Sequence, residues 1–186
     1  MPNWTNTPPP SITGPGFRLI RTPATQSVTA CITSLDMIGC ATHFYQRRTL
    51  PCEGSGCTPC SEGIGWRWHG WVACILSQTQ EHVLFEFTAP AADYFAKYRD
   101  QHATLRGCIF TAQRNNNRSN ARVLIRCRPA DLAKIQLPPA PDLTSALAHI
   151  WGIPPEHSTI QGHAKRFQRV AINGKKPLKP MPPQAV

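Results

Sequence analysis

The sequence predicts a mainly β protein, folded as a five-stranded Greek-key barrel with one helix between strands three and four. Short runs rich in β-branched and aromatic residues recur along the middle of the chain. Clusters of Gly, Pro, Asn and Asp separate these runs. Only one internal segment carries a clear set of helix signals, and it falls between the third and fourth runs. A length of 186 residues suits one such domain with extended ends.

The first strand is predicted in two parts. Residues 26–34 (Q-S-V-T-A-C-I-T-S) are rich in β-branched side chains, and residues 37–45 continue the strand after a turn at Leu35-Asp36. Residues 46–63 then form a loop rich in Gly, Pro and Cys. Strands two and three are expected at residues 66–76 and 82–88, the latter with alternating Val83, Phe85 and Phe87.

The period changes after Thr88, which is a candidate N-cap followed by Pro90 and good helix formers up to about His102. Residues 105–113 and 121–128 are predicted as strands four and five, joined by a polar turn with three consecutive Asn. A short helix is expected near Pro129, and Asp142 is expected to open a last helix over residues 143–151.

Four parts of the chain follow from this pattern. We expect a disordered Pro-rich arm at residues 1–16 and the barrel domain at residues 17–130, with a cysteine loop at 43–62. A helical extension is expected at residues 131–152 and a basic disordered tail at 153–186. Such a tail could hold polyanions or a protein partner through its cations, Lys165, Arg166, Arg169, Lys175, Lys176 and Lys179, and His163.

The overall charge favours polyanionic partners. The chain has 20 Lys and Arg against 10 Asp and Glu, a net charge of +10, and a pI near 9.6. Its eight cysteines would fit a secreted disulfide scaffold, but the N-terminus lacks a charged and an apolar segment of the secretory type. No apolar run approaches the length of a membrane span. We expect a cytoplasmic, nucleoid-associated protein without membrane contact.

The cysteines of the loop are spaced as metal ligands. Cys52, Cys57 and Cys60 form C-x4-C-x2-C between Gly and Pro residues, with too little apolar material to fold alone. Bound Zn2+ would supply the missing folding energy. His43 is our first choice for the fourth ligand, and Cys40 and His69 are the alternatives.

We expect this zinc to be structural. A catalytic zinc needs an open position and a carboxylate base. Glu53 and Glu62 lie nearby but form no recognised pattern, and the H-x-E of nucleotide deaminases is missing from the sequence. Free or disulfide-bonded cysteines in a surface loop are the alternative interpretation.

Two further stretches indicate nucleic-acid binding. The run from Trp66 to Trp71 (W-R-W-H-G-W) pairs indole rings with cations, and on a strand Arg67 and Trp71 share one face. Either that face or the face of Trp66 and Trp68 is core. On the fifth strand, arginines alternate with apolar residues, which predicts one solvent-exposed face and one buried face. The arginines are Arg122, Arg126 and Arg128.

In element order and in the position of Cys52, Cys57 and Cys60, the chain resembles OB-fold single-stranded nucleic-acid-binding proteins with a zinc module between their first two strands. The resemblance covers about residues 24–130. It implies a ligand groove flanked by the cysteine loop and the Asn-rich loop. It also implies binding without chemistry on the ligand, and it favours DNA over RNA. The expected nucleic-acid contacts are Phe44, Tyr45, Arg47, Arg48, Arg67, Trp71, Arg106, Arg114, Arg118, Arg122 and Arg126.

Two other functions remain open at this point. The chain could be a zinc-stabilised interaction subunit of a larger replication, recombination or ribonucleoprotein assembly, with its aromatic strand and tails facing protein. A metal-dependent nuclease or deaminase is less favoured, because the sequence has no recognised acidic metal cluster. The sequence does not predict an oligomeric state.

Overall fold

The computed structural model describes residues 16–153. The expected Pro-rich arm, except for residue 16, and the expected basic tail, except for residue 153, therefore lie outside the described residues.

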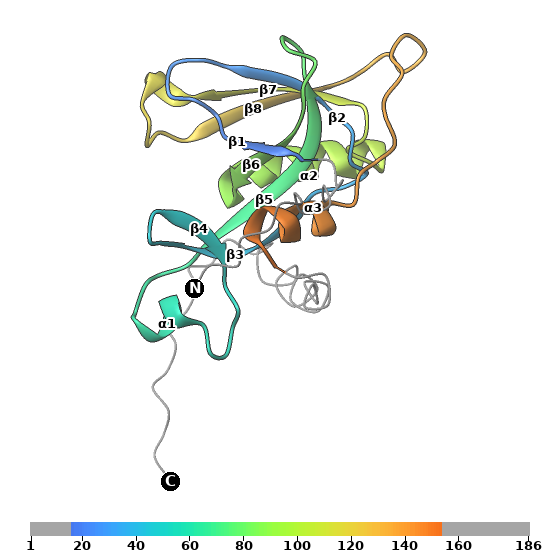
Figure 1. Cartoon of the computed structure of the whole chain (residues 1–186). Helices are drawn as coiled ribbons and strands as arrows, with labels where there is room; N and C mark the ends of the chain where they lie inside the picture. Colours follow the sequence, from blue (N-terminus) through green and yellow to red (C-terminus); the bar gives the residue numbers. More distant parts are fainter. Residues whose placement is uncertain (1–15, 154–186) are drawn as a thin grey trace, which may run out of the picture.

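The described residues form a mixed sheet of eight strands (Figure 1). Six of them follow the order β1-β6-β5-β2-β7-β8, while β3 pairs with β5 and β4 pairs with β3. The pairs are antiparallel except for β1 with β6, which is parallel. The strands are β1 (Arg18–Ile20), β2 (Val28–Ile32), β3 (Ile38–Tyr45), β4 (Arg48–Pro51), β5 (Arg67–Leu76), β6 (His82–Thr88), β7 (Cys108–Arg114) and β8 (Val123–Pro129).

The predicted strands are all present, and the first is indeed split into β2 and β3, which both pair with β5. The expected closed barrel of five strands is wrong. Within residues 16–153 the sheet is open, because β8 pairs only with β7 and β1 only with β6. Two strands were not predicted. β1 pairs with the edge of β6, and β4 lies inside the cysteine loop, where it pairs with β3.

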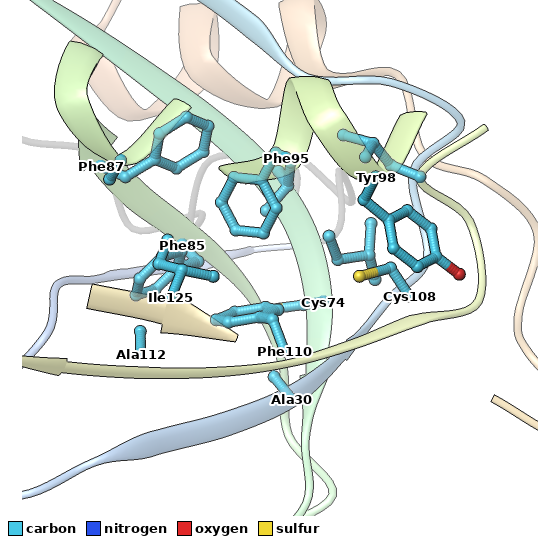
Figure 2. Close-up of a cluster of buried hydrophobic side chains, with 14 of the residues drawn as sticks. Ala30, Cys74, Phe85, Phe87, Phe95, Tyr98, Cys108, Phe110, Ala112 and Ile125 are labelled. Carbon is cyan, nitrogen blue, oxygen red and sulfur yellow. The ribbon is translucent and has the colours of Figure 1, made fainter. Parts of the chain in front are cut away.

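The main core lies between one face of the sheet and helix α2 (Ala89–His102), which follows β6 directly. Figure 2 shows Phe85 and Phe110 of the sheet lying beneath Phe95 of the helix. All three side chains are fully buried. Their ring centroids are 4.8 Å (Phe85 and Phe110) and 5.4 Å (Phe95 and Phe110) apart, which is the range of favourable aromatic pairs.

Helix α3 (Leu143–Trp151) covers part of the opposite face of the sheet, over β5 and β6. Asp142 caps this helix as predicted, because its side chain accepts hydrogen bonds from the amides of Thr144 and Ser145. Leu143 and Leu147 pack there against Trp71. The expected short helix near Pro129 is not formed, since Pro129 ends β8 and residues 132–134 form a turn. Among the described helices, none is both long and apolar enough to cross a membrane.

Candidate metal centre and binding groove

Four side chains of the cysteine loop converge on one point. The ligand atoms of His43, Cys52, Cys57 and Cys60 all lie within 4.8 Å of one another. The Cys60 thiol is 3.6 Å from the Cys52 thiol and 3.4 Å from Nε2 of His43. This group could hold a metal ion, and it includes the fourth residue that we chose from the sequence. Neither Cys40 nor His69 belongs to it.

Local structure explains how the four residues meet. His43 lies on β3, and Cys52 follows β4, so the β3–β4 hairpin brings both to the same end. Cys57 is the N-cap of the one-turn helix α1 (Thr58–Ser61), and Cys60 lies within this helix, three residues later. His43 is fully buried, and its Nδ1 has no hydrogen-bond partner among the described residues.

The thiols of Cys57 and Cys60 do not ionise independently. Burial opposes ionisation of Cys57, but backbone hydrogen bonds from Cys60 and Glu53, together with the thiols of Cys60 and Cys52, lower its pKa. Desolvation and the neighbouring Cys52 and Cys57 raise the pKa of Cys60 to about 12. One thiolate is thus favoured and the next is repelled, and a bound divalent cation would remove that repulsion.

The residues that are not part of the cluster have other surroundings. Burial raises the pKa of Cys40 to about 12, so this thiol is held neutral. His69 instead binds Thr42, whose Oγ1 lies 2.5 Å from its Nδ1. The raised pKa does not separate Cys40 from Cys60, whose pKa is also raised to about 12. Position does separate them, because the ligand atoms of Cys40 and His69 lie outside the converging group and that of His43 lies inside it.

A groove of about 1110 Å3 lies beside the cluster. One wall comes from the cysteine loop and its hairpin, through Phe44, Thr49 and Ile64. The other wall comes from the loop between β7 and β8, through residues 119–122. In Figure 1 this loop and the turn between β3 and β4 lie on the same side of the molecule. The two loops that the sequence predicted to flank a groove do line one groove.

Three of the predicted arginines line this groove: Arg67, Arg114 and Arg122. Arg67 and Arg122 are exposed. Arg114 is half-buried, and its guanidinium donates to the carbonyls of Thr22 (2.9 Å) and Ala121 (3.1 Å). None of the three has a carboxylate partner within residues 16–153. A partly buried guanidinium that binds only neutral carbonyls keeps its full charge available to an anion.

The groove also holds one buried carboxylate, which the sequence analysis missed. Glu86 has a side chain that is 2% exposed and lies 2.7 Å from Arg21. His69 approaches the same carboxylate at 3.8 Å. Burial lowers the pKa of His69, the Glu86 charge opposes this effect, and the Arg21 and Arg67 charges add to it. Because Arg21 neutralises Glu86, the three unpaired arginines leave the groove positively charged.

Trp71 is not a surface ring. It is 1% exposed and packs against Trp151 of α3 with ring centroids 5.3 Å apart. The predicted stacking role of Trp71 is therefore wrong, because α3 covers that face of β5. Trp68 packs on the main core, and Trp66 is 45% exposed. The exposed aromatic ring in the groove is instead Phe44, which is 69% exposed.

Arg106 is also misplaced by the sequence analysis. It precedes β7, outside the groove, and its guanidinium donates to the carbonyls of Thr33, Leu137 and Pro138. These contacts tie residues 137–138 to the end of the sheet, so Arg106 is a structural residue.

The remaining predicted contacts do not line the groove. Tyr45 donates a hydrogen bond to Glu62 (2.9 Å), while Arg47 and Arg48 are exposed at the hairpin turn. Arg118 is exposed in the β7–β8 loop, and Arg126 is exposed on β8. The predicted solvent-exposed and buried faces of β8 are confirmed, since Ile125 is buried between exposed Leu124 and Arg126.

Arg21 is the second groove residue that the sequence analysis missed. It follows the short strand β1, and no local pattern marks it; its role depends on Glu86, 65 residues away.

Comparisons of the chain with protein-family models, with curated proteins and with solved structures found no match.

Proposed function

We propose that the protein binds single-stranded nucleic acid in the groove between the cysteine loop and the β7–β8 loop, without chemistry on the strand. One observation carries this proposal: Arg67, Arg114 and Arg122 line a groove that also exposes Phe44, and none of the three has a carboxylate partner in the described part of the chain. Phosphates would lie on the guanidinium groups and a base would stack on the phenyl ring. DNA is favoured over RNA by the OB-fold resemblance alone.

The strand arrangement supports an OB-like architecture of the partly open kind. β2 pairs with both β5 and β7, α2 connects β6 to β7, and β7 pairs with β8. That is the pairing expected if β2 and β3 together act as the first strand of such a fold. In OB-folds the loops after the first and fourth strands flank the ligand, and here the corresponding loops line the groove.

We further propose that the bound metal is zinc and that it is structural. Three thiols and one imidazole are a common donor set for structural zinc. With Zn–S bonds of about 2.3 Å, tetrahedral sulfurs lie about 3.8 Å apart, close to the 3.6 Å between Cys52 and Cys60. His43 and Cys52 would tie the ends of both hairpin strands, and thereby fix Phe44 on the groove wall.

Binding of a fluorescein-labelled oligonucleotide, followed by fluorescence anisotropy over a salt titration, tests the proposal. DNA and RNA strands are compared on metal-loaded protein of measured zinc content. We expect affinity to fall steeply with salt. In the double variant Arg67→Ala, Arg122→Ala the slope of log K against log salt should decrease by about 1.4, or about 0.7 per lost phosphate contact. Phe44→Ala should cost about 1–3 kcal/mol.

Arg126→Ala, Arg128→Ala is the matched control, because it removes the same charge from two exposed positions of β8 that do not line the groove. Equal weakening by both double variants would mean that net charge, rather than the groove, holds the strand. Unchanged binding by the groove variant would exclude the assignment.

A protein-interaction subunit is the second candidate. Leu132 and Ile135 are 54% and 39% exposed and line a hollow of about 500 Å3 with Arg106, and this hollow shares no residue with the groove. Exposed apolar side chains around a hollow suit a protein partner. A protein that co-purifies with the chain and is lost in Leu132→Ser, Ile135→Ser, while no oligonucleotide binds at low salt, would favour this function.

A further inference from the structure

Two cations of the β3–β4 hairpin, Arg47 and Arg48, have no part in the groove. Phe44 and Thr49, at the base of the hairpin, line the groove, but Arg47 and Arg48 at its turn do not. Both arginines are exposed, and neither has a carboxylate partner among the described residues. Positive charge therefore continues past the end of the groove on this one element.

The turn itself has an unusual backbone. Tyr45 pairs with Arg48, so Gln46 and Arg47 form a two-residue connection. Both have positive φ, +48° for Gln46 and +64° for Arg47. Two-residue hairpin turns of this kind strongly prefer Asn-Gly or Asp-Gly, because other side chains are strained there. Strain of this sort persists where the surrounding structure holds it, and it is found often at binding sites.

The hairpin is held from three sides. His43 and Cys52, on its two strands, belong to the metal cluster. Tyr45 donates a hydrogen bond to Glu62, and Arg21 donates one to Thr49 (2.8 Å). An exposed ring and two arginines thus stand on a short, braced hairpin at the rim of the groove. The braced backbone fixes the point from which these groups project, which lowers the cost of ordering when they meet a rigid ligand.

We propose that this hairpin recognises the junction between single-stranded and double-stranded nucleic acid. The inference rests on the proposed function: the single strand occupies the groove, and the adjoining duplex end lies against the hairpin. On a tailed duplex the flat terminal base pair stacks on Phe44, in the place that a single base takes when the free strand is bound, and the duplex phosphates bind Arg47 and Arg48. A duplex has a higher charge density than a single strand, so each arginine gains more from counterion release on the duplex side.

The test compares three labelled oligonucleotides on the full, metal-loaded chain: a single strand of roughly 10 nucleotides, within the usual site size, a blunt duplex, and that duplex carrying the same strand as a tail. Tails of both polarities are used. We expect one tailed duplex to bind about tenfold more tightly than the free strand, equivalent to about 1.4 kcal/mol. In Arg47→Ala, Arg48→Ala this preference should vanish, while affinity for the free strand changes less than about threefold.

Two further variants separate recognition from folding. Arg126→Ala, Arg128→Ala removes equal charge elsewhere and should keep the preference. Gln46→Asn, Arg47→Gly supplies the favoured turn residues, so its thermal midpoint should be equal to or above that of the wild type while its junction preference falls. If the turn had only a structural role, the junction preference should be kept in this variant wherever the thermal midpoint is kept.

The outcomes separate the two proposals. If the free strand binds but neither tailed duplex binds more tightly, or if the preference survives in Arg47→Ala, Arg48→Ala, the junction inference is wrong and the groove proposal stands. If the free strand does not bind at all, both are wrong.

Discussion

Two regions of this molecule are stabilised by different forces. The sheet under α2 buries large apolar side chains, among them Phe85, Phe95 and Phe110. The cysteine module, residues 43–62, has only three buried residues, His43, Cys57 and Pro59, and two of these belong to the metal cluster. Hydrophobic burial can hold the first region. The second has a cluster that could hold a metal ion, and a bound metal would offset the entropy of ordering its loop. Each region should therefore respond to a different perturbation.

The largest expected effect is on the sheet. Trp71→Ala removes a fully buried indole between β5 and α3 and should lower the free energy of unfolding by about 3–5 kcal/mol. Denaturant unfolding measures the loss, and zinc content should stay unchanged. Phe44→Ala is the matched aromatic truncation in the module, where the ring is 69% exposed; it should change stability by less than about 0.5 kcal/mol. A small loss for Trp71→Ala would mean that α3 does not pack as described.

Metal removal should act on the module. Chelation should lower apparent stability by about 2.7 kcal/mol when the metal had been present at 100 times its dissociation constant. Hydrogen exchange should then show lost protection in β4 and α1, with protection kept in β5 and β6. Cys57→Ser should reproduce this pattern, whereas Cys40→Ala, outside the cluster, should retain the metal. Loss of protection throughout the sheet would show that the two regions do not separate.

The same division accounts for what the sequence could predict. The convergence of the cysteines could be predicted because Cys52, Cys57 and Cys60 are close in sequence, and three cysteines at this spacing in a loop with little apolar material are typical of a metal site. The strand runs and α2 were found because their signals are local as well. Features of this kind are formed by side chains that lie near one another along the chain.

Three of the errors involve contacts between distant segments. Trp71 was assigned to the surface because nothing near it shows that residues 143–151 cover its face. Arg106 was assigned to the groove although its partners are carbonyls at residues 137–138. The barrel was expected to close, but β1, a strand of three residues with no periodic signal, pairs with the edge of β6.

A smaller effect is expected at the cap of α3. Asp142→Ala removes the hydrogen bonds to the amides of Thr144 and Ser145 and should cost about 1 kcal/mol of unfolding free energy. Asp93→Ala, at an exposed position of α2, is the control and should cost less than about 0.5 kcal/mol. If both variants lost the same unfolding free energy, the Asp142 cap would not stabilise helix α3 where it packs on Trp71.

The smallest effect distinguishes the sheet from the module by pH. Burial lowers the pKa of His82, whose Nε2 lies 2.7 Å from Oγ1 of Thr33 and whose ring packs against Phe17. A lowered folded-state pKa means that the unfolded chain binds the proton more readily, so stability increases with pH below the unfolded value of 6.5 and is fully present above it.

Acidification also protonates thiolates of the module and releases metal, which affects the wild type and His82→Gln alike. The difference between their urea midpoints at pH 7.5 and pH 5.5 therefore isolates His82, and the wild type should lose more stability on acidification than the variant. If both proteins lost the same stability on acidification, the pKa of His82 would not be lower in the folded protein than in the unfolded chain.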